Sequence, residues 1–528
     1  MKENRIKRIQ DIIMPCLLLS TLTGIFTGTL IFLFKAAVSF VVSSSETIYE
    51  YVRSHPNCVP FLLIGAAVLG LLSAFLLKKV PDARGGGIPA AIATLRGLIP
   101  FHWIKSIVFV FFSSMMTYFG GIPLGNEGPS VQMGTAAGRG TVSLFAKKHP
   151  AWDRYIMTGG ACAGFAAATG SPITGILFAI EEAHYRISPM IFMSAAMTVI
   201  SGTAVSQALC ELTDRQYSMF DFQLDAVLPL RYIWAAIVIG LLAGFAAAGY
   251  TKMYHGIRHF VKKTLNPIPY GVKIAAIFVV SACVGLVSAS CIGSGHHLIG
   301  ELLEGQHITW ILAAVFLVRA VLLLLANNAD ITGGLFVPTL AFGAIIGAVC
   351  GKCMTLAGIL PEEFYPVIVI IGIASYLGAS SRTPLIALAF SVEALGGLAN
   401  LIPIAAAVTI SYLVIETLGI SDFTDTVIES RIESANHGKK IHTIEADITV
   451  SPDAFACGKA VRDLFLPPTC VILSIRREQD MHLPTSVIAA GDVLHVHYRT
   501  FDPDETVRQL EGVFGCQEKA DFYESTFG

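Results

Sequence analysis

Long apolar runs dominate the chain up to about residue 430. Runs close to 20 residues in length recur at 60–78, 190–210, 232–250, 272–292, 310–326 and 400–418. Each run is long enough for an α-helix to cross the roughly 30 Å hydrocarbon core of a bilayer. The pattern therefore predicts an all-α polytopic membrane domain over residues 1–435.

The pattern changes after the polar stretch ESRIESANHGKK. From residue 440 onward the long apolar runs stop and acidic residues become frequent. Short alternating segments predict strands at 442–450, 470–477 and 492–499, and helices at 456–465 and 503–513. We expect residues 440–528 to form a small soluble α+β domain.

Composition agrees with a membrane protein. The chain has 528 residues, of which 54% are hydrophobic and 14% charged, and its mean hydropathy is +0.66. Soluble domains carry about 25% charged residues. The net charge of −2 gives no reason to expect a nucleic-acid partner. The basic start MKENRIKR places the N-terminus in the cytoplasm by the positive-inside rule, and no signal-peptide pattern follows it.

Two glycine- and proline-containing patterns occur once in each half of the membrane domain. Gly125-x3-Pro129-x4-Gly134-x3-Gly138 recurs as Gly334-x3-Pro338-x4-Gly343-x3-Gly347, and Gly160-x11-Pro172-x5-Phe178-x2-Glu181 recurs as Gly372-x11-Pro384-x5-Phe390-x2-Glu393. The two offsets, 209 and 212 residues, nearly agree. Matching broken segments in two halves are typical of transporters with internal repeats, and they point to the binding site.

Broken helices inside a membrane leave backbone N–H groups without partners, so they occur only where they are buried in protein or line a cavity. A helix N-terminus also carries a partial positive charge and free N–H donors. Broken helices from both halves, pointed inward, would form an anion site without a lysine or arginine. Such a site suits conduction, because a full positive charge would hold an anion too tightly.

Three motifs occur in order: GGGIP at 85–89, GNEGP at 125–129 and GGLFVP at 333–338, with ILFAIEE at 176–182 between the last two. Over roughly residues 12–430 the chain resembles the CLC family of chloride channels and proton-coupled anion antiporters. The resemblance implies two inverted halves and a homodimer in membrane lipid with one pore for inorganic anions in each subunit.

The resemblance implies a role for two carboxylates. Glu127 corresponds to the external gate, whose carboxylate occupies an anion position and leaves it when protonated. Burial favours the neutral acid and N–H donors favour the carboxylate, so such a group can titrate in step with anion occupancy. Glu182 corresponds to the internal proton acceptor. The alternative for Glu127 is a glutamate that caps a helix start and faces water. The alternative for Glu182 is an ordinary helix-end carboxylate beside Glu181.

The resemblance also implies an anion-binding set made mostly of backbone groups. Its members are Gly86, Gly87, Ile88, Gly125, Asn126, Gly128, Leu335, Phe336 and Thr424. The N–H groups of Leu335 and Phe336 fall where the family binds the central anion.

Three positions depart from the family pattern. Gly86 replaces a serine that favours chloride over nitrate, and Thr424, next to Phe423, falls at the position of the pore tyrosine. Asn126 replaces a common arginine. Gly86 and Asn126 together resemble the fluoride-exporting branch, whereas Glu182 argues against it because that branch usually lacks this acid.

The segment from Ala456 to Tyr498 resembles the C-terminal RCK (TrkA-C) domain of bacterial potassium-transport regulators, which predicts a bacterial inner-membrane protein with this domain in the cytoplasm. Related domains pair across a two-fold axis and bind cyclic di-AMP. The candidate contacts are Ile475, Arg476, Arg477, His482 and Pro484. The alternative is a domain that only stabilises the dimer.

We therefore expect a proton-coupled chloride antiporter whose C-terminal domain is regulatory. A passive anion channel and a fluoride/proton antiporter are the alternatives within the family, and a ligand sensor with a vestigial membrane domain is an alternative outside it. Walker motifs, nucleophile elbows and metal-ligand clusters do not occur in the sequence. The sequence therefore predicts neither an enzyme nor a bound metal or cofactor beyond the transported ions.

Overall fold

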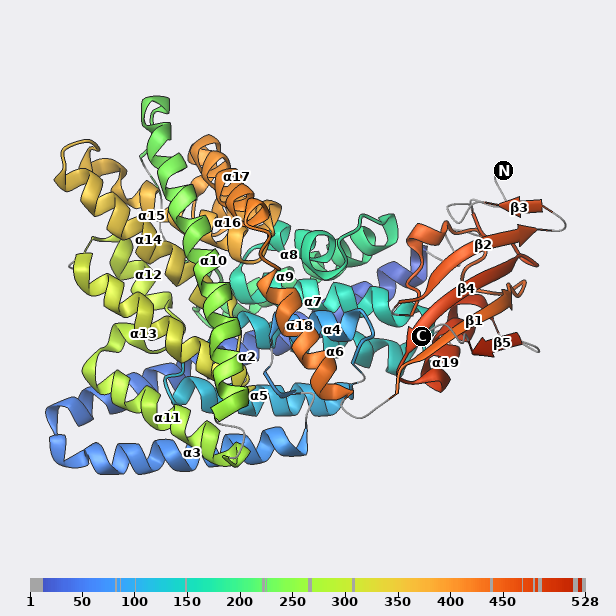
Figure 1. The fold of residues 1–528 in the computed structure, drawn as a ribbon, viewed down its shortest axis with the longest axis horizontal. Helices are drawn as coiled ribbons and strands as arrows, with labels where there is room; N and C mark the ends of the chain where they lie inside the picture. Colours follow the sequence, from blue (N-terminus) through green and yellow to red (C-terminus); the bar gives the residue numbers. More distant parts are fainter. Residues whose placement is uncertain are drawn as a thin grey trace.

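The computed structural model describes residues 13–80, 83–85, 87–99, 101–147, 150–220, 224, 226–264, 268–305, 309–436, 440–467, 469–477, 480–482, 487–515 and 521–524. Figure 1 shows a large helical part and, beside it, a small sheet from the C-terminal part of the chain. The helices of the large part are α2 (Met14–Ser54), α3 (Val59–Lys79), α4 (Ile88–Leu95), α5 (Trp103–Phe119), α6 (Glu127–Phe145), α7 (Asp153–Thr169), α8 (Pro172–Phe178), α9 (Pro189–Leu212), α10 (Ile233–Thr264), α11 (Tyr270–Val287), α12 (His296–Leu303), α13 (Thr309–Asn328), α14 (Phe336–Leu356), α15 (Tyr365–Ser380), α16 (Pro384–Glu393), α17 (Leu401–Thr417) and α18 (Phe423–Ala435).

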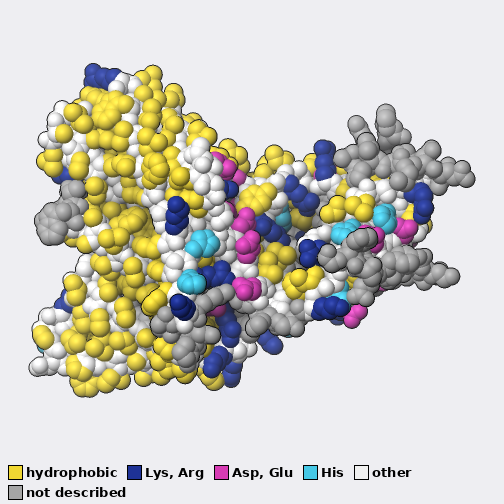
Figure 2. Space-filling view, viewed as in Figure 1, with side chains coloured by type: hydrophobic (Ala, Val, Ile, Leu, Met, Phe, Trp, Pro, Cys, Tyr) yellow, Lys and Arg dark blue, Asp and Glu magenta, His cyan; other side chains and the backbone are white. Residues whose placement is uncertain are grey.

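The predicted polytopic membrane fold is confirmed. Among the described residues, nine helices are long and apolar enough to cross a membrane. Each of the six apolar runs seen in the sequence overlaps a helix of this set, and the run 272–292 extends past the end of α11 at Val287. Figure 2 shows hydrophobic side chains covering the helical part, with charged side chains gathered on the side toward the sheet. The basic segment at residues 1–8 lies outside the described part of the chain.

The repeated glycines are the points at which consecutive helices touch. A Cβ atom on Gly134 of α6 would lie 2.1 Å from the carbonyl oxygen of Gly160 in α7, and the reverse distance is also 2.1 Å. In the second half, Gly343 of α14 and Gly372 of α15 stand in the same relation, at 2.6 and 2.5 Å. Small residues at these positions let the backbones approach closely, as is common in membrane helix pairs.

The repeated glutamates connect the two halves. Glu181, at the end of the α8 segment, accepts hydrogen bonds from the N–H groups of Leu385 (2.9 Å) and Ile386 (2.7 Å) in the first turn of α16. Glu393, at the end of α16, accepts bonds from the N–H groups of Ile173 and Thr174 in the first turn of α8, both at 2.7 Å. Each half therefore satisfies the free N–H groups of a broken helix in the other half.

The C-terminal part contains a five-stranded sheet with the order β3-β2-β4-β1-β5, in which every neighbouring pair is antiparallel. Its strands are β1 (His442–Thr449), β2 (Val471–Arg477), β3 (Asp480–His482), β4 (Val493–Thr500) and β5 (Asp521–Glu524), and α19 (Pro503–Phe514) follows β4. Leu510, Val513 and Phe514 of α19 pack into the core of this sheet. The expected small α+β domain is confirmed as a fold.

The helix expected at 456–465 is wrong. The chain there forms turns and one 3₁₀ helix, Val461–Asp463. Gly458 has a φ of +75°, which ends a right-handed helix. The N–H of Gly458 bonds to the carbonyl of Ile488, and the N–H of Ile488 bonds to the carbonyl of Lys459. This segment is thus held by a long-range backbone pairing that periodicity does not reveal.

The reciprocal capping gives a test of stability. Glu393→Ala leaves two first-turn N–H groups of α8 and the Thr174 hydroxyl, which also donates to Glu393 at 2.6 Å, without their acceptor. We expect a loss of about 1–3 kcal/mol in the free energy of unfolding, and a smaller loss for Glu393→Gln, which keeps an acceptor oxygen. Thermal unfolding of the purified wild type and both variants in detergent would measure these losses.

The matched control is Glu362→Ala, because the Glu362 side chain is 83% exposed. Exposed substitutions of this kind change stability by less than about 0.5 kcal/mol. Equal shifts for Glu393→Ala and Glu362→Ala would contradict the capping role.

Candidate functional site

The two repeated motifs meet at their helix starts. Gly125 before α6 and Gly334 before α14 form an isolated antiparallel bridge. The N–H of each residue bonds to the carbonyl of the other, both at 2.7 Å. The bridge satisfies backbone groups that would otherwise be unpaired inside the membrane. It also sets the first turns of α6 and α14 against each other.

The third motif joins the same point through a glycine contact. A Cβ atom on Gly128 would lie 2.4 Å from the Cα of Gly87 and 2.7 Å from the Cα of Gly334. Gly87 precedes α4 and has a φ of +98°, a conformation that side chains disfavour. Three segments from distant parts of the sequence therefore converge at a contact that only glycine allows.

Glu127 lies at this junction. It is the first residue of α6, and its side chain is fully buried. Its Oε2 lies within 2.4 Å of the position a Cβ on Gly125 would take, and its carboxylate interacts with the N–H groups of Glu127 itself and of Val337 in the first turn of α14. Neither oxygen has a hydrogen bond of ordinary geometry among the described residues. The carboxylate thus lies between two helix N-termini, the environment that favours a bound anion.

Lys35 of α2 is the cation that acts on Glu127. Its Nζ donates to the carbonyl oxygens of Tyr217 at 3.0 Å and Ala167 at 3.3 Å, the latter in the last turn of α7. The sequence gives no signal for this lysine, because it lies within a 41-residue apolar helix and no motif contains it.

A small cavity of about 40 Å³ lies beside the junction. Five of the predicted site residues line it: Ile88, Glu182, Leu335, Phe336 and Thr424. The other lining residues are Pro89, Tyr250, Thr339, Tyr376, Leu377, Ser380, Ser381, Thr383, Ile386 and Phe423. The first turns of α4, α14 and α18 all reach this cavity, which has room for only a few water-sized particles. It is therefore a small site lined by helix starts.

Glu182 reaches the cavity from a π-helical turn, Ala179–Ala183. Only 5% of the surface of Glu182 is exposed. The carboxylates of Asp422 and Asp425 and the guanidinium of Arg96 lie close enough to interact with it. π-Helical turns are rare and are frequent at functional sites. The turn therefore presents a buried acid on the side of the cavity formed by α18.

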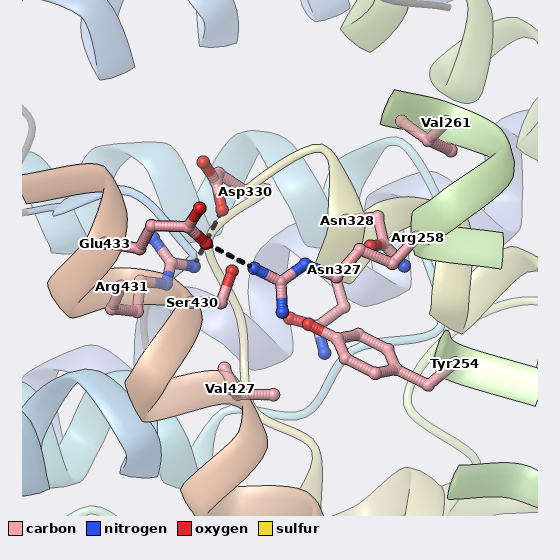
Figure 3. Close-up of a pocket in the computed structure, with 10 residues that line it drawn as sticks. All are labelled: Tyr254, Arg258, Val261, Asn327, Asn328, Asp330, Val427, Ser430, Arg431 and Glu433. Carbon is pink, nitrogen blue, oxygen red and sulfur yellow. Dashed lines mark hydrogen bonds and ion pairs between the residues drawn. The ribbon is translucent and has the colours of Figure 1, made fainter. Parts of the chain in front are cut away.

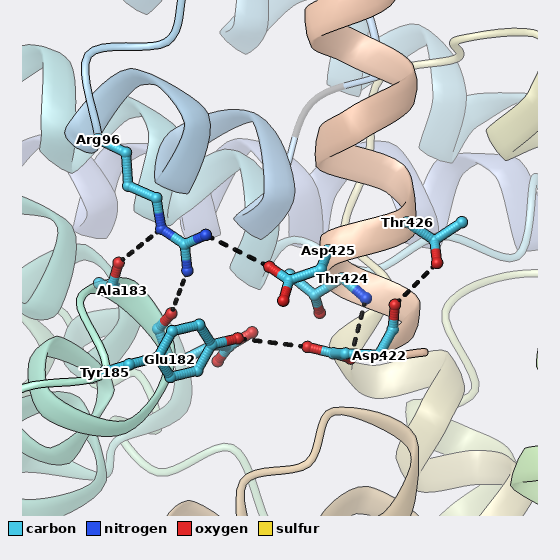
Figure 4. Close-up of polar contacts among 8 residues, drawn as sticks. All are labelled: Arg96, Glu182, Ala183, Tyr185, Asp422, Thr424, Asp425 and Thr426. Atoms are coloured by element: carbon cyan, nitrogen blue, oxygen red, sulfur yellow. Dashed lines mark hydrogen bonds and ion pairs between the residues drawn. The ribbon is translucent and has the colours of Figure 1, made fainter. Parts of the chain in front are cut away.

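Arg96 organises this side of the site (Figure 4). Its guanidinium donates to the carbonyls of Glu182 at 3.2 Å and Ala183 at 3.1 Å and to the carboxylate of Asp425 at 3.3 Å. Tyr185 donates to Asp422 at 3.4 Å, and Asp422 accepts the N–H of Thr424 at 3.1 Å.

These contacts join the π-helical turn to the start of α18. The roles of Arg96, Asp422 and Asp425 were missed, since each is a lone charge outside the repeated motifs.

The other predicted anion-binding residues divide into two groups. Gly125 and Gly128 are buried at the three-motif junction, with Gly87 beside them, and Asn126 is the half-buried residue before α6. Gly86 lies outside the described residues, so its prediction has no structural counterpart. The structure thus places Glu127 at the junction and Glu182 on the cavity.

A second, larger cavity of about 310 Å³ lies next to α18 (Figure 3). Its charged residues pair with one another: Arg258 with Glu433 at 3.1 Å, and Arg431 with Asp330 at 3.1 Å. Arg431 also donates to the carbonyl of Arg84 at 2.7 Å. Because Asp330 precedes the GGLFVP motif and Arg84 precedes GGGIP, these pairs tie both motif loops to α18.

Phe465 is one of the residues through which the C-terminal domain contacts the membrane domain. Its ring lies 4.5 Å from the ring of Tyr155 in α7 and 4.6 Å from the ring of His184. The guanidinium of Arg186 lies over the same ring at 4.6 Å. Tyr155 also donates to the carbonyl of Asp463. His184 and Arg186 lie two and four residues after Glu182, so the C-terminal domain is in contact with the segment that follows this buried acid.

The predicted ligand contacts of the soluble domain differ in their surroundings. Ile475 is fully buried in the core of the sheet. Arg477 bonds Asp492 through two nitrogens at 2.7 and 2.8 Å, and these bonds raise the pKa of Arg477 above its ordinary value. Arg476 lies 3.6 Å from Asp447 and is about half exposed. The side chain of His482 and all of Pro484 lie outside the described residues.

Comparison with solved structures finds the same fold. A slow cyanobacterial Cl⁻/H⁺ antiporter matches with a TM-score of 0.74 and 22% identity, over 80% of this chain and 99% of that chain. A CLC-type fluoride/proton antiporter matches with a TM-score of 0.64 and 21% identity, over 77% and 96%. A eukaryotic CLC transporter matches with a TM-score of 0.65 and 19% identity, over 79% and 74%.

The fold and the convergent helix starts define a polytopic membrane protein of the anion-transport class. The family model for the voltage-gated chloride channel matches residues 69–416. The chain belongs to this family, and the resemblance seen in the three motifs is confirmed.

The glycine junction predicts a sharp steric effect. Gly128→Ala would place a methyl group 2.4 Å from the Cα of Gly87, so the backbone of another motif would have to move. Overpacking of this kind costs about 1–3 kcal/mol, and we expect anion flux into liposomes to fall at least about tenfold. Gly249→Ala is the control, because a Cβ on Gly249 of α10 meets nothing within 4 Å. Normal flux through the Gly128→Ala protein would contradict the tight junction.

Proposed function

We propose that the chain is a proton-coupled anion antiporter that transports mainly chloride. The observation that carries the proposal is the buried carboxylate of Glu127, which lies between the first turns of α6 and α14 at the point where three motifs converge. A carboxylate there occupies an anion position. Chloride and this carboxylate would therefore compete for the same helix N-termini.

The competition gives a coupling mechanism. Protonation of Glu127 removes its negative charge, which weakens its hold on the helix starts and frees the position for an anion. Deprotonation returns the carboxylate and expels the anion. Glu182, buried on the cavity beside α18, would pass the proton to and from the cytoplasm. One acid at the junction and one on the neighbouring cavity would allow protons and anions to exchange in opposite directions.

The alternatives within the family make different demands on these residues. A passive channel needs no proton acceptor, whereas Glu182 is buried and held in a network with Arg96 and two aspartates. A fluoride/proton antiporter is favoured by Asn126 and Gly86 and is also a protein of this fold. Reversal potentials in liposomes with chloride, nitrate and fluoride under a pH gradient would separate the three functions.

Replacement of the gate carboxylate tests the coupling. The amide in Glu127→Gln cannot carry a proton, so we expect proton transport to fall to background while chloride flux continues. Proton uptake by liposomes in a chloride gradient and chloride efflux from the same preparation would measure both.

The companion variant is Glu182→Gln, in which proton transport should also fall while anions still pass. Glu362→Gln is the matched control, because that side chain is exposed. Proton pumping at the wild-type rate by Glu127→Gln would refute the gate role. An unchanged ratio of protons to anions in Glu182→Gln would refute the internal acceptor.

We propose further that the C-terminal domain regulates transport through Phe465. The ring of Phe465 packs on His184 and beneath Arg186, two and four residues after Glu182. Any movement of the domain would act directly on the loop that carries the internal acid. A ligand of the domain can change transport only if it binds two states of this contact with different affinity. Cyclic di-AMP, with Arg476 as its exposed basic candidate, remains a prediction, as do the homodimer and its place in a bacterial inner membrane.

Phe465→Ala tests this contact. Loss of three ring contacts should release the loop, and we expect the anion transport rate to change at least about twofold with full folding of both domains. Leu473→Ala is the control, because Leu473 lies on the same domain and is exposed. Identical rates in wild type, Phe465→Ala and Leu473→Ala, with and without cyclic di-AMP, would leave the domain without a regulatory role.

A further inference from the structure

Three residues that line the small cavity carry a buried hydroxyl group. The phenol oxygens of Tyr250 in α10 and Tyr376 in α15, and the hydroxyl of Thr383 before α16, are buried without a hydrogen bond among the described residues. All three residues line the cavity that Leu335 and Phe336 also line. A buried hydroxyl without a partner destabilises the folded protein. Three such groups on one cavity indicate that a ligand in the cavity accepts hydrogen bonds from them.

The two tyrosines form one unit. The ring of Phe342 lies 5.5 Å from the ring of Tyr250 and 5.8 Å from the ring of Tyr376. Tyr250 also packs against Phe423, the first residue of α18, at 5.4 Å. Aromatic packing of this kind fixes both rings, and the two phenols are close enough to interact electrostatically. Their hydroxyls are therefore held in place before any ligand enters.

We propose that the hydroxyls of Tyr250 and Tyr376 bind the transported anion directly, and this inference rests on the proposed function. The start of α18 presents Phe423 and Thr424 to the cavity, so no phenol reaches it from that helix. Tyr250 and Tyr376 bring two phenols from α10 and α15 instead. A halide accepts hydrogen bonds from several donors at once and donates none, which matches a cavity with surplus donors.

Neutral donors also suit turnover. Hydrogen bonds from uncharged groups to an ion are stronger than those between neutral groups, so they can replace part of the hydration that the anion loses. They add no full positive charge, so the anion can still leave when the carboxylate of Glu127 returns. The two phenols would act together with the N–H groups at the start of α14, and they would bind the anion on the side of the cavity toward α18.

Isosteric Tyr→Phe variants test the assignment. We expect Tyr250→Phe and Tyr376→Phe each to weaken chloride binding at least about tenfold in calorimetry on the full-length protein in detergent. Tyr365→Phe is the matched control. Tyr365 is a buried tyrosine of the same helix α15, but its hydroxyl donates to the carbonyl of Leu302 at 2.9 Å. This variant should bind chloride as the wild type does.

Thermal unfolding with and without chloride gives a second measurement, the stabilisation of the protein by chloride. A tyrosine hydroxyl with a purely structural role would not change this stabilisation. Removal of an unpartnered hydroxyl should leave the chloride-free variants as stable as the wild type, or more stable. The stabilisation of the wild type by saturating chloride should shrink in both variants and nearly vanish in the double variant. Tyr365→Phe should lose stability equally with and without chloride.

The outcomes separate this inference from the proposed function. If wild-type liposomes transport chloride and protons but both tyrosine variants bind chloride with wild-type affinity, the phenols bind only water and the inference is wrong. If the wild type shows no proton-coupled anion transport, the proposed function itself fails. Chloride binding weakened in Tyr250→Phe and Tyr376→Phe but not in Tyr365→Phe would establish the phenols as anion ligands.

Discussion

The need to satisfy backbone N–H groups at broken helices governs this structure. A helix that starts in the middle of a membrane exposes donors that lipid cannot accept. The protein answers with contacts between its two halves: Gly125 and Gly334 bond to each other, Glu181 caps α16, and Glu393 caps α8. Each half is therefore incomplete without the other. The residues that repeat in the sequence are the residues that make this exchange, which explains why glycine, proline and glutamate recur at matching places.

The same constraint creates the functional site. The first turns of α6 and α14 remain aimed at a common point after the bridge between Gly125 and Gly334 has formed, and the carboxylate of Glu127 lies there. The partial charges of helix starts attract an anion without the permanent hold of an arginine. Lys35 acts on the site from α2, while its amine is held by carbonyl groups. The site thus combines the weak fixed dipoles of helix starts with one buried acid.

The loop after Glu182 connects the site to the rest of the protein. Residues 182–186 include the buried acid Glu182 and the carbonyls that accept hydrogen bonds from Arg96. The same segment holds the phenol of Tyr185, which donates to Asp422, and the ring of His184, which packs on Phe465. The start of α18 and the soluble domain are therefore both in contact with one short segment. A change in either would reach Glu182 through direct contacts, as the proposed regulation requires.

Apolar runs were enough to predict six of the nine long apolar helices among the described residues. The repeated motifs predicted the two halves, and the place of GGGIP beside GNEGP and GGLFVP rested on the family resemblance. These features are local, because hydrophobic length, helix-breaking residues and close-packed glycines are recorded in the residues themselves. Two features that depend on long-range contacts could not be predicted in this way. The helix expected at 456–465 was wrong because a pairing with Ile488 replaces it, and the reciprocal caps at Glu181 and Glu393 were seen only as a repeat. Tyr250, Tyr376, Arg96 and Asp422 gave no signal in the sequence, since a single polar residue gains its meaning only from its neighbours on other elements. Arg96, for example, bonds carbonyls on the π-helical turn, and Asp422 accepts a bond from Tyr185. Tertiary structure alone decides which hydroxyl or carboxylate faces the cavity, because that depends on the packing of helices from both halves around it.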